Sequence, residues 1–278
     1  KRAEGWIEKI ENVIVKASNQ NKWFTIENLE FCISVWGKTL NEKDITEWLA
    51  NYPEQNKPTR LALVLAGNIP LVGLHDVLCG LASGCSIEAK LSSNDNLLLP
   101  FVVDFLVSVM PNWEDKVCFI EGSLKTYDKV IATGSNNSAR YFEYYFKKKP
   151  HIIRKTRIGI AVLDGNETQD DLAALSKDMI QYFGLGCRSV SHIMVPDGYD
   201  FKKLFLALFV HKELIQHSAY ANNYDYNKAV YLMQEQEFLE NGFIILKKDD
   251  RLSSPIACVN YSTYTNLKAV NQRLHDQE

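Results

Sequence analysis

The sequence predicts an α/β protein that contains a doubly wound, mostly parallel β-sheet followed by a second α/β domain. Short, wholly apolar segments such as "LALVLA" (61–66) are typical of strands that are buried on both faces of a sheet. They alternate with segments in which apolar residues recur at three-to-four spacing, the helical period. Strands and helices in alternation imply parallel strands that are joined by right-handed crossovers.

The first part of the chain opens with helices and then begins to alternate. Segments 4–17 and 41–52 have helical spacing, and Asn41 suits the N-cap of the second helix. A polar, proline-containing connector follows at 52–60. The alternation then predicts strands at 61–66, 86–91, 117–120 and 129–133, and helices at 70–83, 95–110 and 137–147.

The second part continues the alternation after a boundary that we place near residue 155. We therefore expect two domains, 1–155 and 156–278. In the second domain the pattern predicts strands at 157–163, 189–195, 243–247 and 256–261, and helices at 168–183, 201–217 and 224–240.

Composition narrows the functional classes. The 278 residues are 46% hydrophobic and 23% charged, with a net charge of −3 and basic residues spread along the chain. This composition and this spread of basic residues predict no binding surface for nucleic acids or for membranes. The longest apolar stretch, 96–110, contains Pro100 and Asp104 and is too short to span a bilayer.

The six cysteines include no C-x-x-C pair, so we expect no metal site and a reducing, cytoplasmic compartment. Cys79 and Cys118 lie in apolar runs and resemble small core residues. Because the first residue is Lys1, we expect the natural start to lie further upstream. The final residues are polar. If the natural chain continues beyond them as well, the second domain is truncated in this sequence.

Asn68 follows the first predicted strand, where ligands of such sheets bind. Its amide could donate to a ligand oxygen, and a plain turn asparagine is an equal alternative from this stretch alone. Lys90 ends the next strand, and Ser92 and Ser93 follow it. A lysine and serines at a strand end suit a ribose or a phosphate, and they also suit an ordinary polar loop.

Thr133, Gly134 and Ser135 join a predicted strand to a predicted helix. Backbone N–H groups at a helix N-terminus can receive a phosphate, although Ser135 could equally be only the N-cap. The chain contains no G-x-G-x-x-G motif.

Cys187 stands in "QYFGLGCRSVSHIMVP" (181–196), at a turn between helix-like and strand-like segments. A nucleophilic thiol must be ionised, accessible and close to an oxyanion site. Gly184 and Gly186 would let backbone approach a substrate closely, and the Cys187 N–H could itself be an oxyanion donor. The alternative is a reduced cysteine packed at a turn, which is the commoner fate of a single cysteine.

The order of these stretches resembles the aldehyde dehydrogenase superfamily, whose corresponding elements look like P-W-N-x-P, K-P-S-E, T-G-S and G-Q-x-C. The segment "LVLAGNIPLVGLHDVLCGLASG" is similar to the Gly-Asn-Val/Ile-Pro segment of the acyl-CoA reductase branch, the relatives of the fatty-acid reductase of bacterial luminescence. The resemblance covers roughly residues 60–260. It implies an aldehyde-dehydrogenase-like fold, with a Rossmann-like nicotinamide-cofactor domain at 1–155 and a catalytic domain at 156–278.

The resemblance assigns roles to individual residues. Cys187 would be the nucleophile, and Asn68 would hold the oxyanion together with the Cys187 N–H. Lys90, Ser92, Ser93, Thr133, Gly134 and Ser135 would bind the cofactor. NAD-preferring relatives carry a glutamate three residues after the lysine, where this chain has neutral Ser93. The resemblance therefore favours NADPH, with NADH as the alternative.

The chain departs from the superfamily at two motifs. Members that oxidise aldehydes carry a glutamate that activates the hydrolytic water, and "AVLDGNE" places Val162 or Leu163 there. An enzyme that reduces an acyl intermediate needs no such base, although a shifted alignment would supply Glu167. The E-x-F-G-P motif that grips the nicotinamide ribose is also absent.

The favoured interpretation is an oxidoreductase that reduces an acyl thioester such as acyl-CoA to an aldehyde through an acyl-cysteine intermediate. A non-redox cysteine acyltransferase or thioesterase, or a non-catalytic interaction protein, remains the alternative. An acyl-transferring or acyl-activating protein partner and self-association stay open. His75, His192, His211 and His217 are minor candidates for catalysis, and packing is the more common role of each. The Tyr/Asn cluster at 218–232 could line a substrate channel or form a helix seam.

Overall fold

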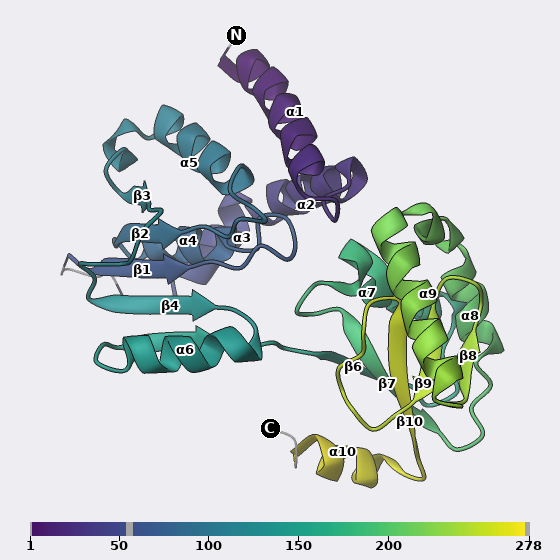
Figure 1. The fold of residues 1–278 in the computed structure, drawn as a ribbon. Coiled ribbons are helices and arrows are strands. Elements are labelled where there is room, and N and C mark those ends of the chain that lie inside the picture. Colours follow the sequence, from purple (N-terminus) through teal and green to yellow (C-terminus); the bar gives the residue numbers. More distant parts are fainter. Residues whose placement is uncertain (1, 54–57, 276–278) are drawn as a thin grey trace. The chain divides into compact units, whose positions relative to one another are not determined.

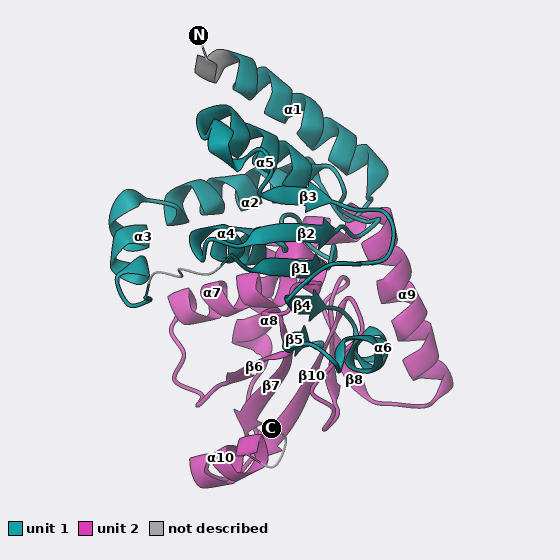
Figure 2. Ribbon diagram, turned by 90° about the vertical axis from the view of Figure 1, so that its left-hand side faces the viewer, with its two compact units in different colours: residues 1–156 teal, residues 157–278 magenta. Residues whose placement is uncertain are grey.

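The protein is described by a computed structural model that covers residues 2–53 and 58–275. The chain forms two compact units, residues 1–156 and 157–278, which Figure 2 shows in different colours. Each unit contains its own five-stranded sheet. The expected connector at 52–60 falls partly outside the described residues.

The sheet of the first unit is parallel throughout. Its strand order is β3-β2-β1-β4-β5, so the chain winds outward in both directions from β1. Figure 1 labels the strands β1 to β4 of this sheet. Burial on both faces explains the apolar run in β1, where Ala62 and Leu63 are fully buried. The strands are β1 (Arg60–Val64), β2 (Ser86–Lys90), β3 (Val117–Phe119), β4 (Lys129–Thr133) and β5 (His151–Arg154).

The helices of the first unit begin where the sequence supplies side-chain caps. Thr25, Asn41 and Ser135 each accept a hydrogen bond from the backbone N–H three residues further on. The helical segments are α1 (Arg2–Gln20), α2 (Ile26–Thr39), α3 (Glu42–Leu49), α4 (Leu74–Ala82), α5 (Leu98–Val109), η1 (Pro111–Trp113) and α6 (Asn136–Phe146). Buried Asp76 of α4 receives two hydrogen bonds from Arg154 at the end of β5, at 2.6 and 2.7 Å.

The second unit has the strand order β6-β7-β10-β9-β8, and only β8 is antiparallel to its neighbour. Its core is a continuous apolar cluster from the sheet and from α7 and α8, with Ile193, Leu204 and Leu246 fully buried. The strands are β6 (Gly159–Val162), β7 (Val190–Pro196), β8 (Phe238–Glu240), β9 (Ile245–Lys248) and β10 (Cys258–Tyr264). The helical segments are α7 (Gln169–Ile180), η2 (Gln181–Gly184), α8 (Lys202–Phe209), η3 (Lys212–Gln216), α9 (Ser218–Met233) and α10 (Leu267–His275).

Helix α9 explains the Tyr/Asn cluster. Its buried residues recur at helical spacing and form one face, made of Tyr220, Tyr224, Asn227 and Tyr231. Asn227 donates to the Ile256 carbonyl oxygen at 3.1 Å, which ties the helix to the segment before β10. The cluster is therefore a packing seam. None of the described helices is long and apolar enough to cross a membrane.

Several predicted elements were wrong at their ends. The expected helix at 224–240 is α9, which ends at Met233 because Glu235 adopts a left-handed backbone (φ 53°), and β8 follows. The expected helix at 201–217 ends at Phe209, and a 3-10 turn replaces the rest. Strand β5 and helix α10 were not predicted. Cys118 is exposed rather than part of the core, because β3 is the edge strand of its sheet.

Candidate functional site

The predicted cofactor residues and Asn68 come together at one edge of the first sheet. Strands β2, β1 and β4 are neighbours and run parallel, so the residues that follow their carboxyl ends lie at the same edge. Asn68 follows β1, Lys90–Ser93 end and follow β2, and Thr133–Ser135 end and follow β4. This is the edge at which ligands of open α/β sheets bind.

The loops after β1 and β2 pack closely on each other. A Cβ atom on Gly67 would lie 2.7 Å from the Ser92 side chain and 3.1 Å from the Asp95 backbone nitrogen. Only glycine allows this approach. Asn68, the next residue, is exposed, as are Lys90 and Ser93. Both loops thus present exposed residues at this edge.

The segment after β4 can hold a phosphate-bearing ligand. The hydroxyl oxygen of Thr133 is buried and has no hydrogen-bond partner among the described residues. Gly134 lies against α6, where a Cβ atom would approach the Phe142 ring to 2.9 Å. Ser135 caps α6, since its hydroxyl accepts from the Ser138 N–H at 3.2 Å. The backbone N–H groups at the N-terminus of α6 are the part of this segment that could receive a phosphate.

Cys187 is exposed and follows a backbone segment of unusual geometry. Tyr182 (φ 53°, ψ 35°) and Phe183 (φ 59°, ψ 26°) are both left-handed, and Gly184 continues at φ 73°. Left-handed conformations cost a non-glycine residue about 1–2 kcal/mol. Two consecutive aromatic residues in this conformation therefore store strain four to five residues before Cys187, and the surrounding packing must hold it.

The Phe183 ring provides that packing. Phe183 is 5% exposed, and its ring centroid lies 4.3 Å from the ring of His217 and 5.9 Å from that of Tyr220. The His217 Nδ1 atom accepts the Tyr220 N–H at 3.3 Å and so caps helix α9. The sequence left the role of His217 open between catalysis and packing. In the structure, His217 joins the α9 N-terminus to the turn before Cys187.

Glu167 holds a loop together. Its Oε1 atom accepts hydrogen bonds from the Asp164 and Gly165 backbone N–H groups, at 2.5 and 3.0 Å. Its Oε2 atom accepts from the Tyr199 hydroxyl at 3.1 Å. The loop also leaves the side chain of Val162 partly exposed at the end of β6.

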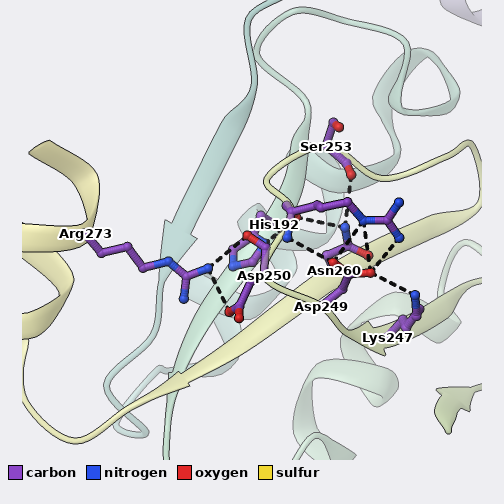
Figure 3. A network of polar contacts seen from close by, with 8 residues as sticks. His192, Lys247, Asp249, Asp250, Ser253, Asn260 and Arg273 are labelled. Carbon is purple, nitrogen blue, oxygen red and sulfur yellow. Dashed lines mark hydrogen bonds and ion pairs between the residues drawn. The ribbon is translucent and has the colours of Figure 1, made fainter. Parts of the chain in front are cut away.

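His192 is fully buried between β10 and the loop after β9 (Figure 3). The Arg251 carbonyl can only accept, so the His192 Nδ1 atom donates to it at 3.0 Å. The Nε2 atom then accepts from the Ser262 hydroxyl at 2.8 Å. Burial lowers the pKa of this imidazole. His192 is therefore a neutral structural residue.

The same loop receives further hydrogen bonds from side chains on both flanks (Figure 3). Asn260 donates to the carbonyl oxygens of Arg251 and Ser253, at 2.9 and 3.0 Å. Buried Lys247 and exposed Arg251 both contact Asp249, and the Arg251 hydrogen bonds lower the pKa of that carboxyl. These bonds fix the connection between β9 and β10.

The remaining histidines have other contacts. His211 lies 3.2 Å from the Ser176 hydroxyl, and His75 lies 3.5 Å from the Asp76 carboxylate and 3.6 Å from the Cys79 sulfur. Burial raises the pKa of the Cys79 thiol, which makes it a poor nucleophile. Among residues 2–53 and 58–275, no group of three or more His, Cys, Asp or Glu side chains could hold a metal ion.

Sequence reasoning missed two supporting residues, Asp95 and Phe183. Asp95 lies in a polar loop, and Phe183 in an aromatic stretch, so neither gave a local signal. Both make tertiary contacts, and only Gly184, next to Phe183, indicated unusual backbone in the sequence. Asn68 belongs to the first unit and Cys187 to the second.

The fold is that of an aldehyde dehydrogenase. Solved structures similar to this chain include PutA from Anabaena variabilis, assigned as an aldehyde dehydrogenase (TM-score 0.72, 13% identity, covering 99% of this chain and 71% of that one). Another is betaine aldehyde dehydrogenase from Staphylococcus aureus (TM-score 0.69, 13% identity, 99% and 67%). A third is the indole-3-acetaldehyde dehydrogenase AldA of P. syringae with NAD+ (TM-score 0.61, 12% identity, 78% and 54%). The chain thus spans between 54% and 71% of these proteins.

The family is more specific than the fold. Residues 38–254 match the family model of the acyl-CoA reductase LuxC, so this chain belongs to the LuxC acyl-CoA reductase family. Comparison with curated protein sequences gave no match. The resemblance to the acyl-CoA reductase branch is confirmed, as is the expected fold class.

Proposed function

We propose that this chain reduces an acyl-CoA thioester to an aldehyde, with Cys187 as the covalent nucleophile. The observation that carries the proposal is an exposed cysteine four residues after the strained residue Phe183, in a chain of the acyl-CoA reductase family. Backbone strain persists where the surrounding packing over-determines it, and it gathers at functional sites. Cys187 combines this strain with exposure, whereas Cys258 is buried in the same unit.

The Cys187 thiolate attacks the thioester carbonyl and forms a new C–S bond. The C–S bond to CoA then breaks, CoA leaves as a thiolate that takes a proton from solvent, and the acyl group stays on Cys187. The Asn68 amide and the Cys187 N–H stabilise the oxyanion of this step. Losing one such donor costs about 2.7–4 kcal/mol in comparable enzymes.

A nicotinamide cofactor would be held at the edge of the first sheet, by Lys90, Ser92 and Ser93 on one side and by Thr133–Ser135 on the other. When bound in its reduced form, it supplies the hydride that converts the acyl carbonyl to the aldehyde. The bond to Cys187 then breaks, which regenerates the thiol. The neutral Ser93 and the cationic Lys90 favour a cofactor with a 2′-phosphate, and hence NADPH.

The contacts of Glu167 favour reduction over hydrolysis. A thioesterase needs a base that activates water, and both oxygens of the Glu167 carboxylate are already occupied by hydrogen bonds within its own loop and from Tyr199. An acyl intermediate on Cys187 would then persist long enough to be reduced.

Two measurements on the purified chain test the proposal. NADPH consumption with acyl-CoAs of increasing chain length, followed at the reduced-nicotinamide absorbance band, reports reduction. Intact-protein mass with acyl-CoA and no cofactor reports acylation. We expect Cys187→Ala to abolish both. Cys258→Ala is the matched control, because burial raises the pKa of that thiol to about 11 and leaves it protonated.

The outcomes separate the alternatives. An acyl adduct without NADPH consumption indicates an acyltransferase or thioesterase, and no adduct at all indicates a non-catalytic protein. Aldehyde formation by Cys187→Ala at the wild-type rate would refute the role of Cys187.

A further inference from the structure

Asp95 connects the two loops that form the ligand-binding edge of the first sheet. It lies in the loop after β2, two residues beyond Ser93, and is 8% exposed. Its Oδ2 atom accepts the backbone N–H of Leu71 at 3.0 Å. Leu71 lies three residues after Asn68 in the loop that follows β1. One buried carboxylate thus joins the predicted oxyanion loop to the predicted cofactor loop.

The Asn68 loop depends on this bond because its backbone is strained. Leu71 is a left-handed residue (φ 53°), a conformation that is strained outside glycine. A hydrogen bond to a charged acceptor is stronger than one to a neutral acceptor. The bond from Leu71 to Asp95 therefore offsets part of the strain that closes the loop.

The carboxylate of Asp95 is only partly satisfied by its hydrogen bonds. The Oδ1 atom is buried and has no hydrogen-bond partner among the described residues. Burial raises the pKa of this carboxyl, although the N–H groups of Leu71 and Leu98 act in the opposite direction. A buried oxygen without a partner costs free energy, so the bond to Leu71 is kept against a cost to the fold.

The loop that carries Asp95 is itself braced from its other side. At the end of α1, Gln20 donates to the Ser93 carbonyl oxygen at 3.1 Å, and Asn21 donates to the Asn94 carbonyl oxygen at 3.1 Å. Gly67 packs against Ser92 on the inner side. The Asn68 loop is thus attached to a loop that is already fixed.

We propose that Asp95 is a positioning residue that holds the Asn68 amide in place for the oxyanion and couples it to the cofactor loop at Ser92 and Ser93. The proposal rests on the proposed function, in which Asn68 stabilises the oxyanion. Asp95 contacts no reacting atom and acts only through Leu71 and the loop that Leu71 closes.

A double-mutant cycle tests this role. We expect Asn68→Ala to lower kcat about 10²–10³-fold. Asp95→Ala should lower kcat about 10- to 100-fold, as a small misplacement of a catalytic group does, with little change in the KM for acyl-CoA. In the Asn68→Ala background, Asp95→Ala should have almost no further effect on kcat. Fully multiplicative losses would overturn the proposal, because Asp95 would then act independently of Asn68.

Matched variants separate positioning from folding. Asp95→Asn keeps an oxygen that can accept the Leu71 N–H, so we expect most of the wild-type kcat. The serine side chain in Asp95→Ser is too short to reach the Leu71 N–H. This variant therefore takes the place of Asp95→Ala if the alanine variant fails to fold. Asn12→Ala removes an exposed hydrogen bond within α1, from Asn12 to the Glu8 carbonyl oxygen at 3.0 Å, touches neither loop, and should leave kcat unchanged. Loss of activity in Asp95→Asn equal to that in Asp95→Ser would contradict the role of the Leu71 bond.

Amide hydrogen exchange gives a readout that does not depend on activity. We expect Asp95→Ser to accelerate exchange at residues 67–71, while Asn68→Ala leaves it unchanged. Unchanged exchange in Asp95→Ser overturns the positioning role even in an active enzyme. If exchange is accelerated in Asp95→Ser but the wild-type protein reduces no acyl-CoA, the proposed function fails and the positioning of the loop by Asp95 stands.

Discussion

Replacing Phe183 with alanine should cost unusually little stability but much of the reaction rate. Truncation of a buried phenylalanine typically costs about 3–5 kcal/mol. The Phe183 ring is 5% exposed and packs on His217 and Tyr220, so the full loss would be expected from packing alone. However, the ring also holds Tyr182 and Phe183 in left-handed conformations, at about 1–2 kcal/mol each.

If the turn relaxes when the ring is removed, the released strain of about 2–4 kcal/mol offsets most of the packing loss. We therefore expect a net loss of about 1–2 kcal/mol for Phe183→Ala. Phe243→Ala is the matched control, because Phe243 is 1% exposed in the same unit and has no left-handed backbone. The Phe243→Ala variant should lose about 3–5 kcal/mol of stability, which is typical when a buried phenylalanine is truncated. Urea unfolding of the three proteins measures both values.

The kinetic consequence is a thiol that is present but misplaced. We expect Phe183→Ala to reduce acyl-CoA about 10- to 100-fold more slowly than the wild type. Its exposed Cys187 should still react with iodoacetamide at a similar rate, since a small reagent needs no fixed approach. A Phe183 variant that loses as much stability as the Phe243 variant, and keeps the wild-type kcat, would refute the link between the ring, the strain and the nucleophile.

Two further predictions concern cofactor choice and pH. Ser93→Glu should shift the ratio of kcat/KM for NADPH and NADH toward NADH by about 1–3 kcal/mol. Asn94→Glu, one position further, is the control and should leave this ratio unchanged. An unchanged ratio in the Ser93 variant would place Ser93 away from the ribose. For His192, burial lowers the folded pKa, so the unfolded chain takes up the proton first as the pH falls below about 6.5. Stability should therefore decrease from there until the lowered folded pKa is reached, and urea unfolding between about pH 7.5 and pH 5 should show this slope in the wild type and lose it in His192→Gln.

The sequence by itself determined the alternation of strands and helices and the order of the motifs. Buried parallel strands must be apolar on both faces, so segments such as 61–66 could be recognised without a structure. Caps such as Asn41 and Ser135 mark helix starts through local chemistry, and the structure contains both. Motif order indicated the acyl-CoA reductase family, which the family match confirms.

The tertiary structure decided what holds the motifs in place. The bond between Asp95 and Leu71 and the contact between Phe183 and His217 join residues 24 and 34 positions apart, and no local pattern encodes them. The helix end near Met233 was misjudged because a left-handed Glu235, rather than a glycine or proline, stops the helix. Cys118 was misjudged because edge and central strands share the same apolar pattern, and only strand order separates them. Local propensity depends on neighbours in the chain, whereas strain and burial depend on neighbours in space.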